Sequence, residues 1–311
     1  MLATIFWTNV FLYIISSLYA KLTCGINKCS KHLVNKVVIV TGGNAGIGFE
    51  TAKDLAARGA KVILACRNIG KGNEARDKII QETGNKDVHV KILDLASFKS
   101  VRAFADDILK NEKQLDILIN NAGMIGHEFK KTEDGLLMDM QSNHFGPFLL
   151  TSLLLPLLKS SGPSRIINVS SFMHFIGKLD LDNLNLENGE YGTMRAYSNS
   201  KLCNVLMTVE LAKRLKGTEV TVNCLHPGAV RTGIFTGPWW SGMFNTLVAP
   251  LYKDPWSGAQ TQIYLAVAPE LSKVSGKYFA DCHMKSPSAL SQDAELAEKL
   301  WHYSEKLTKL K

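Results

Sequence analysis

The 311-residue sequence predicts an α/β fold in which one doubly wound parallel sheet is flanked by helices. From residue 36 onward, short runs rich in Val and Ile alternate with longer amphipathic segments. The runs lack the polar–apolar alternation of a half-exposed strand, so we expect strands that are buried on both faces. Parallel strands joined through helices connect by right-handed crossovers, which gives a single sheet with two helical layers.

Six short runs are the expected strands. They are KVVIVT (36–41), KVILAC (61–66), VHVKIL (88–93), LDILIN (115–120), RIINVS (165–170) and EVTVNC (219–224). Amphipathic stretches such as 48–59 and 97–113 predict helices between them. The apolar stretch 145–158 contains Pro147 and Pro156 and is too short for a membrane span. We therefore expect a helix there that is buried in the core or at a subunit contact.

The N-terminal segment 1–20 predicts a membrane anchor, because it has no charged side chain and is rich in aromatic residues. A signal peptide cleaved near Ala20 is the alternative, but no basic residue precedes the apolar stretch. Residues 21–35 form a basic linker without acidic side chains, which predicts a cytosol-facing domain at 36–311. The endoplasmic reticulum is the expected membrane, with a lipid droplet or mitochondrial membrane as alternatives. Retention or cleavage of the segment stays open.

Composition excludes several functions. The balance of 36 basic against 28 acidic residues gives a net charge of +8. The basic residues are scattered rather than clustered, which argues against nucleic-acid binding and favours an anionic membrane surface or cofactor. Six cysteines form no C-x-x-C pair, so no zinc site or disulfide framework is expected. His144, His174 and His226 are isolated from other metal-ligand residues, and we expect no metal.

A glycine-rich turn at Thr41–Gly48 follows the first strand and opens the first helix. Gly42, Gly46 and Gly48 keep this turn tight and let a pyrophosphate approach the backbone at the helix N-terminus. The turn lacks the G-K-[ST] sequence of a Walker loop. A Rossmann-type dinucleotide site is therefore predicted; the alternative is that these glycines only make a turn.

Arg67 ends the second strand, at the position that reads the adenosine ribose. A carboxylate there would bind the free 2′-hydroxyl of NAD, whereas a guanidinium suits a 2′-phosphate. The sequence therefore favours NADP over NAD, unless Arg67 is simply a surface residue at a strand end.

Tyr197 and Lys201 in AYSNSK (196–201) lie four residues apart and so share one helical face. A tyrosine titrates at about 10 in water, and a nearby lysine charge favours its phenolate. The pair suggests acid–base chemistry, although two polar helix positions would show the same spacing.

Together with the glycine turn, NNAG (120–123) and YSNSK (197–201) resemble the short-chain dehydrogenase/reductase family over residues 36 to about 280. Within that family the chain is most similar to the membrane-bound retinol dehydrogenases. The motifs that support this are LACRN, SNHFGPFLLT, NVSSFMH, YSNSKLCNVL, HPGAVRT and AEKLWHYSEKL.

The resemblance implies a catalytic tetrad of Asn143, Ser171, Tyr197 and Lys201. Tyr197 would exchange a proton with the substrate oxygen during hydride transfer. Lys201 would lower the pKa of Tyr197 and hold the nicotinamide ribose. Ser171, which the family pattern favours over Ser170, would bind the developing alkoxide, and Asn143 would keep a water beside Lys201.

The resemblance also implies an NADP(H) site. Its residues would be Gly42, Asn44, Gly46, Ile47, Gly48, Arg67, Asp94, Leu95, Asn120, Gly123, Tyr197, Lys201, Pro227, Gly228, Val230 and Thr232. Asp94 would bind the adenine, although a charge at a helix N-terminus is its alternative reading. The segment from Pro227 to Thr232 would hold the nicotinamide carboxamide.

The expected function is an NADP(H)-dependent oxidoreductase that interconverts a lipophilic alcohol and its aldehyde or ketone, with retinol and retinal as the leading pair. Farnesol-like isoprenoids, fatty aldehydes and sterols are alternative substrates. The apolar insert 233–252 is expected to form a substrate wall, or else a packed surface helix pair. A dinucleotide-binding sensor or scaffold without turnover is the alternative of another class. A serine hydrolase is set aside because no G-x-S-x-G is present. A homodimer is possible.

Overall fold

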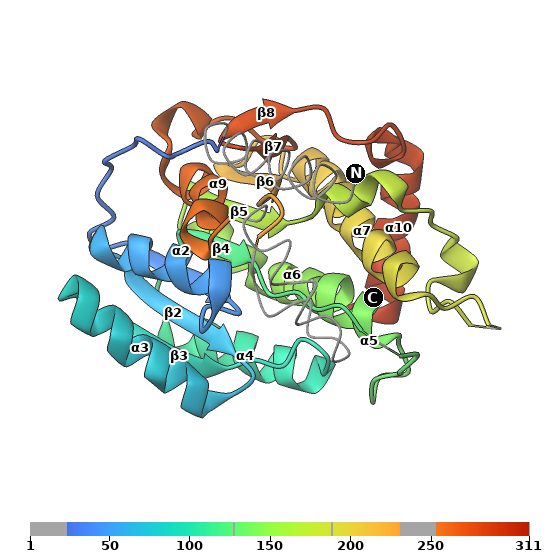
Figure 1. The fold of residues 1–311 in the computed structure, drawn as a ribbon, viewed down its shortest axis with the longest axis horizontal. Helices are drawn as coiled ribbons and strands as arrows, with labels where there is room; N and C mark the ends of the chain where they lie inside the picture. The colour runs from blue at the N-terminus through green and yellow to red at the C-terminus, as the bar shows by residue number, and fades with distance from the viewer. Residues whose placement is uncertain (1–23, 127, 188, 231–252, 311) are drawn as a thin grey trace, which may run out of the picture.

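The computed structural model describes residues 24–126, 128–187, 189–230 and 253–310. Within them the strands form one eight-stranded sheet in the order β3-β2-β1-β4-β5-β6-β7-β8 (Figure 1). The pairs from β3 to β7 are parallel, and β8 runs antiparallel to β7. The strands are β1 (Val37–Thr41), β2 (Lys61–Cys66), β3 (Val88–Ile92), β4 (Ile117–Asn120), β5 (Ser164–Val169), β6 (Val220–His226), β7 (Tyr278–Ala280) and β8 (His283–Lys285). The expected doubly wound sheet is confirmed.

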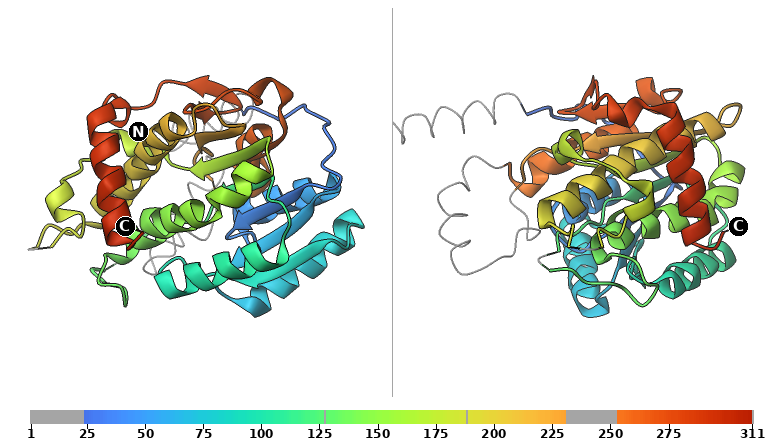
Figure 2. Two further views of the ribbon diagram at one scale, coloured as in Figure 1. Left: turned by 180° about the vertical axis from the view of Figure 1, so that it is seen from behind. Right: turned by 90° about the vertical axis from the view of Figure 1, so that its right-hand side faces the viewer.

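Helices cover both faces of this sheet (Figures 1 and 2). They are α2 (Gly46–Ala57), α3 (Ile69–Thr83), α4 (Phe98–Asn111), α5 (Met138–Met140), α6 (Gly146–Ser160), α7 (Thr193–Arg214), α9 (Pro255–Val267) and α10 (Ala294–Leu307). A π-helical turn occupies Gln141–Phe145, and 3-10 helices occupy Phe172–Ile176, Leu181–Asn183, Pro269–Leu271 and Leu290–Gln292. The 3-10 helix Phe172–Ile176 directly follows Ser171, and the π-helical turn contains Asn143. Two candidate catalytic residues are therefore placed by irregular helical turns.

Alternate residues of the central strands enter different cores. Val37 and Ile39 of β1 pack in the core formed with α4, α6, α7 and α10. Val38 and Val40 pack in the core formed with α2, α3 and α9. Successive side chains of a strand point to opposite faces, so both faces of β1 are buried. This explains why the strands are continuous Val/Ile runs in the sequence.

β7 and β8 were not expected, because three residues are too few to show a periodic pattern. β7 is a strand because it pairs with the end of β6, from Cys224↔Tyr278 to His226↔Ala280. The β8 residues are exposed, and among the described strands they pair only with β7. These two strands therefore follow from tertiary contact rather than from local sequence.

The apolar stretch 145–158 forms α6, which is a core helix. Phe148 and Leu154 are fully buried, and the Phe148 ring meets Trp301 of α10 at 4.8 Å between centroids. Within the described residues, no helix is both long enough and apolar enough to cross a membrane. The expected anchor at 1–20 and the insert at 233–252 lie outside the described residues.

The described part of the expected linker is held against the domain. Arg58 at the end of α2 donates from Nη1 to the carbonyl of Cys29 at 2.8 Å. The amide of Leu33 donates to the carbonyl of Arg58 at 2.8 Å, and the Leu33 side chain is buried. Asn27 donates its amide to Gln260 of α9 at 3.2 Å. Residues 24–35 therefore pack across α2 and α9.

Candidate active site

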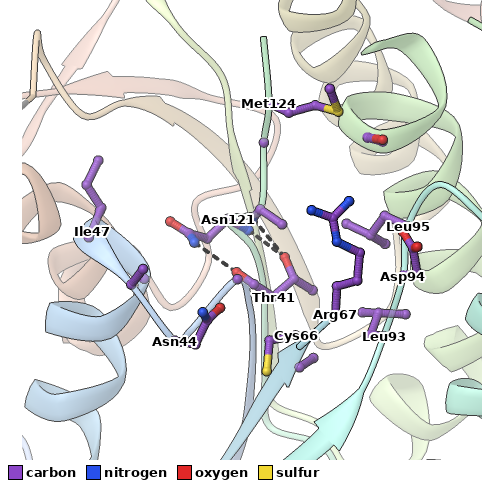
Figure 3. A pocket seen from close by; sticks show the side chains of 18 of the residues that line it. Thr41, Asn44, Ile47, Cys66, Arg67, Leu93, Asp94, Leu95, Asn121 and Met124 are labelled. Carbon is purple, nitrogen blue, oxygen red and sulfur yellow. Dashed lines mark hydrogen bonds between the residues drawn. The ribbon is translucent and has the colours of Figure 1, made fainter. Parts of the chain in front are cut away.

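A cavity of about 610 Å³ opens at the carboxyl ends of the strands, where the strand order reverses between β1 and β4 (Figure 3). Doubly wound sheets bind their ligands in this crevice. Nine residues of the expected cofactor site line it. They are Gly42, Asn44, Gly46, Ile47, Gly48, Arg67, Asp94, Leu95 and Gly123. Ten further lining residues are not among the expected site residues. These are Thr41, Ala45, Ala65, Cys66, Leu93, Asn121, Ala122, Met124, Ile125 and Ser142.

The glycine turn forms one wall of the cavity. Gly42 and Gly46 have φ of 65° and 54°, a region that favours glycine. A Cβ on Gly48 would lie 2.4 Å from the Gly42 carbonyl oxygen and 2.5 Å from Asn121 Nδ2. The N-cap residue, Ala45, offers no side-chain hydrogen bond to the first turn of α2. First-turn amides have no partner within a helix, so an anion in the cavity could accept hydrogen bonds from them.

Gly48→Ala tests this wall. Overpacking of a tight site costs about 1–3 kcal/mol, so we expect a lower melting temperature and NADPH affinity reduced by about 5–150-fold. Fluorescence titration of NADPH and thermal unfolding measure the two effects. Gly70→Ala in α3 is the matched control, because the nearest atom to its added Cβ is Asn68 Oδ1 at 3.4 Å. Equal NADPH affinity in both variants would contradict a close approach at Gly48.

Asn121, rather than Asn120, faces the cavity. Its Nδ2 donates to the Thr41 carbonyl at 2.8 Å, and its Oδ1 accepts from Gln262 Nε2 at 3.1 Å. The Thr41 hydroxyl oxygen in turn accepts the amides of Asn121 and Ala122 at 2.9 and 3.0 Å. This network fixes the end of β4 against the end of β1.

Asn120 does not line the cavity, where the resemblance places it. Its side chain is buried within the structure and donates to Thr151 of α6 at 2.9 Å and to Asn168 of β5 at 2.8 Å. Neighbouring residues of an extended chain point to opposite sides, so a shift of one position changes a lining residue into a core residue. Asn120 therefore joins β4 to β5 and α6.

Arg67 and Asp94 lie at the far end of the cavity from Ile47. Figure 3 shows the Arg67 side chain extending into the space between Asn121 and Leu95. Among the described residues its guanidinium has no hydrogen-bond or ion-pair partner. The Asp94 carboxylate accepts the amide of Ala96 at 3.0 Å, in the turn that precedes α4. Both readings of Asp94 are compatible with this placement, because it lines the cavity and also shapes the turn before a helix.

Asn143 lies in the π-helical turn between α5 and α6, a distortion that occurs often at functional sites. Asn143 is fully buried. Its side chain accepts the Met124 amide and donates to the Met124 carbonyl, each at 2.8 Å. Its Nδ2 also donates to Ser200 Oγ at 3.0 Å. These contacts join the segment after β4 to α7.

Lys201 is buried on α7, where its ammonium donates to the Val169 carbonyl at 3.2 Å. Its Nζ lies 5.5 Å from the ring centroid of Tyr197, one helical turn earlier. A Cβ on Gly123 would lie 3.1 Å from this Nζ and 3.6 Å from Asn143 Oδ1. Gly123 lines the cavity, so Lys201 and Asn143 lie directly behind this part of its wall. None of the four tetrad residues is itself among the lining residues.

Two serines follow β5, and they have different surroundings. Ser170 is buried, and its hydroxyl donates to the Lys201 carbonyl at 2.8 Å. The Ser171 hydroxyl oxygen accepts the amide of Met173 at 3.2 Å, and this serine is near enough to the Tyr197 side chain to lower the pKa of Tyr197. The geometry therefore gives Ser170 a role within the fold and places Ser171 beside Tyr197.

Burial shifts the pKa values of Tyr197 and Lys201 in opposite directions. It raises the pKa of Tyr197 above its ordinary value, and the hydrogen bond with Ser171 only partly opposes this. It lowers the pKa of Lys201 to about 8, because an ammonium is poorly solvated there. The sequence predicted that the Lys201 charge would lower the pKa of Tyr197. In the structure this pKa is raised instead, because the loss of solvation on burial has the larger effect. At neutral pH the site therefore presents a protonated tyrosine beside a lysine that is still mostly charged.

The segment after β6 packs near the glycine turn. Gly228 has a φ of 94°, and a Cβ there would lie 2.8 Å from the Lys253 side chain. Val230 pairs with Lys253, and both Val230 and Ile47 lie within 3.2 Å of a Cβ built on Gly258. Pro227 precedes these residues, immediately after β6. Thr232 lies outside the described residues.

Comparison with known proteins agrees with this geometry. Residues 36–237 match the family model for short chain dehydrogenases. The chain is 49% identical to human retinol dehydrogenase 13, with 88% of this chain and 85% of the relative covered. It is 45% identical to bovine (Bos taurus) retinol dehydrogenase 12, with 94% and 93% covered.

Two solved structures are similar in fold. A crystal structure of an uncharacterised protein from Mycobacterium paratuberculosis is 33% identical with a TM-score of 0.74, and 90% of this chain and 95% of that one are covered. A Pseudomonas aeruginosa RhlG/NADP active-site complex is 25% identical with a TM-score of 0.64, and covers 80% of this chain and 95% of that one.

Proposed function

The chain belongs to the short-chain dehydrogenase family, and from this membership we propose that it is an NADP(H)-dependent oxidoreductase of lipophilic alcohols and carbonyls. The observation that carries the proposal is the position of Lys201 and Asn143 against Gly123 in the wall of a glycine-lined cavity, with Tyr197 one helical turn before Lys201. A binding protein without turnover would have no use for a desolvated tyrosine–lysine pair beside that cavity.

For carbonyl reduction, a nicotinamide held in this cavity would supply a hydride to the carbonyl carbon. The protonated Tyr197 hydroxyl then donates its proton to the oxygen on which negative charge develops. Ser171, beside Tyr197, donates a hydrogen bond to the same oxygen. The buried Lys201 ammonium stabilises the phenolate that Tyr197 becomes, because opposite charges interact strongly where water is excluded. Asn143 holds the Met124 backbone and Ser200, and so keeps the walls around Lys201 in place.

Cofactor choice rests on Arg67. Arg67 lines the cavity, and its guanidinium has no partner among the described residues. Its N–H groups are therefore available to donate hydrogen bonds to a phosphate of a ligand. NADP(H) carries such a phosphate on its adenosine ribose, and NAD(H) does not. We therefore assign NADP(H), with the pyrophosphate at the start of α2 and the adenine near Asp94 and Leu95.

Retinol and retinal are the proposed substrate pair, because several relatives at 44–49% identity are named retinol dehydrogenases. We propose that residues 1–20 anchor the chain in the endoplasmic reticulum membrane with the 36–311 domain facing the cytosol. The apolar insert 233–252 then covers a substrate that partitions into lipid. A homodimer stays a prediction.

The test uses membranes that contain the full chain, all-trans-retinal and either NADPH or NADH. We expect oxidation of NADPH with formation of retinol, and much slower oxidation of NADH. Farnesal and a long-chain fatty aldehyde serve as alternative substrates. NADPH binding without turnover of any of these aldehydes would overturn the oxidoreductase proposal in favour of a sensor or scaffold.

Arg67→Gln tests the cofactor assignment separately. Hydrogen bonds to charged groups contribute about 1.5–3 kcal/mol, so kcat/KM for NADPH should fall by about 10–150-fold. The value for NADH should change little, because NADH offers no phosphate to the guanidinium. Kinetics with both cofactors on the same membrane preparation give the comparison. Equal losses for the two cofactors would show that Arg67 does not read the 2′-phosphate.

A further inference from the structure

The peptide group between Ser171 and Phe172 is held on both sides by histidines. His174 donates from Nδ1 to the Ser171 carbonyl oxygen at 2.6 Å. His226, at the end of β6, accepts the Phe172 amide at its Nδ1 at 3.1 Å. The carbonyl of Ser171 and the amide of Phe172 belong to the same planar peptide group. The two imidazoles therefore fix both polar ends of one plane, immediately after a candidate catalytic serine.

Each histidine is set in one tautomer by its other contacts. His174 is fully buried, and its Nε2 accepts the Ser288 amide at 3.1 Å, so the proton lies on Nδ1. Its ring packs against Tyr278 of β7 at 4.9 Å between centroids. His226 accepts at Nδ1, so its proton lies on Nε2. Burial lowers the pKa of both, that of His226 to about 4, which keeps both rings neutral at physiological pH.

Fixing this plane restrains the start of the Ser171 side chain. The rotation about the Cα–C bond of Ser171 (ψ 158°) sets the direction of its Cα–Cβ bond relative to the peptide plane. The Ser171 hydroxyl also accepts the Met173 amide at 3.2 Å and is near enough to Tyr197 to lower the pKa of Tyr197. Ser171 is followed by a single 3-10 turn, which by itself is a short and weak element. A displacement of about 1 Å in an active site can cost about 10²-fold in rate.

We propose that His174 and His226 are positioning residues that clamp the Ser171–Phe172 peptide and thereby aim the Ser171 hydroxyl at the reacting oxygen. The proposal rests on the proposed oxidoreductase function. Neither imidazole bonds to Tyr197, Lys201 or Asn143 in the described residues, so both act through the backbone. His174 and His226 are isolated from metal-ligand residues in the sequence, and the fold gives them this role beside the site.

The experiment compares two substitutions at His226 in the full chain. His226→Leu removes the acceptor, whereas His226→Asn places an amide oxygen near the former Nδ1. We expect kcat for retinal reduction, normalised to bound NADPH, to fall by about 10–100-fold in the leucine variant. The asparagine variant should recover to within about fivefold of the unsubstituted chain, and KM for NADPH should change less than twofold in both. His302→Leu in α10, a half-exposed histidine distant in sequence from this turn, is the control and should keep the full rate.

Hydrogen exchange of the segment 170–178 gives a readout that needs no substrate. We expect faster exchange in His226→Leu and near-normal exchange in His226→Asn. Unchanged exchange in both variants would overturn the clamp, and faster exchange with an unchanged normalised kcat would overturn its positioning role. An unsubstituted chain without turnover would overturn the oxidoreductase proposal and the positioning role together, while the exchange data would still decide whether the histidines hold this peptide. His174→Asn, which retains a donor near Nδ1, is expected to follow His226→Asn in both readouts.

Discussion

Replacing Tyr197 by phenylalanine is expected to lower kcat for carbonyl reduction by about 10²–10⁴-fold, the usual contribution of a positioned acid. The ring packing is retained, because only the hydroxyl is lost. Burial raises the pKa of Tyr197, so the residue is protonated at neutral pH and is ready to donate. Ser171 has no comparable acidity, and we expect it to be unable to replace the lost donor.

The measurement is single-turnover reduction of retinal with NADPH bound in advance, together with the NADPH dissociation constant. The NADPH dissociation constant should stay within about threefold of that of the unsubstituted chain, because the cavity remains folded. Tyr264→Phe in α9 is the matched control: it also removes one phenolic hydroxyl, and Tyr264 lies outside the cavity at the strand ends. If the Tyr197→Phe chain retains more than a tenth of the normal single-turnover rate, Tyr197 is not the acid.

Lys201→Met is expected to remove activity and to stabilise the fold at the same time. The Lys201 ammonium is buried, and burial lowers its pKa from 10.5 to about 8. At about 1.36 kcal/mol for each pKa unit, the charged form weakens the folded state by up to about 3 kcal/mol at pH 7. Methionine has a similar shape and no charge. The Val169 carbonyl keeps a partner in the substituted chain, because Asn204 also donates to it at 3.2 Å.

The stabilising effect of Lys201→Met is expected to depend on pH. Because the folded-state pKa is below the unfolded one, the unfolded chain binds more protons between about pH 8 and pH 10.5. The free energy of unfolding of the lysine-containing chain therefore gains from this group as pH rises through that window. The stability advantage of Lys201→Met should be largest at or below pH 7 and should shrink by pH 9.5.

Thermal unfolding at pH 7 and pH 9.5, without cofactor, measures this advantage. Lys213→Met on the same helix removes a half-exposed lysine paired with Glu298 and should change stability by less than about 0.5 kcal/mol. A lower melting temperature for Lys201→Met at pH 7 would contradict the desolvation argument. Loss of turnover with a higher melting temperature would show that the site maintains a buried charge for function at the expense of stability.

Much of the fold could be predicted from local pattern. The six runs became β1 to β6. β1, β4 and β5 are buried at nearly every position and so need apolar residues throughout, whereas the outer strand β3 has only Val88 buried. The glycine turn was readable for a similar reason: Gly42 and Gly46 adopt positive φ, and Gly48 has no room for a Cβ. The spacing of Tyr197 and Lys201 placed both on one face of α7, since helical periodicity is local.

Contacts between distant segments could not be predicted in this way. Only the assembled strand ends show that Asn121 faces the cavity while Asn120 points into the core. The direction of the pKa shift at Tyr197 also depends on burial, which no local spacing reports. β7 is a strand only because it pairs with β6.

His174 and His226 also show the difference between what local sequence predicts and what the tertiary structure decides. In the sequence, His174 and His226 are 52 positions apart, in the separate motifs NVSSFMH and HPGAVRT. In the fold, the end of β6 lies beside the turn after β5, and both rings reach one peptide group. The sequence by itself determined the sheet, the glycine turn and the tyrosine–lysine spacing, because each depends on residues a few positions apart. The tertiary structure decided which side chains meet, how strongly water is excluded from them and which serine faces the tyrosine, because these depend on packing between segments that the chain order keeps apart.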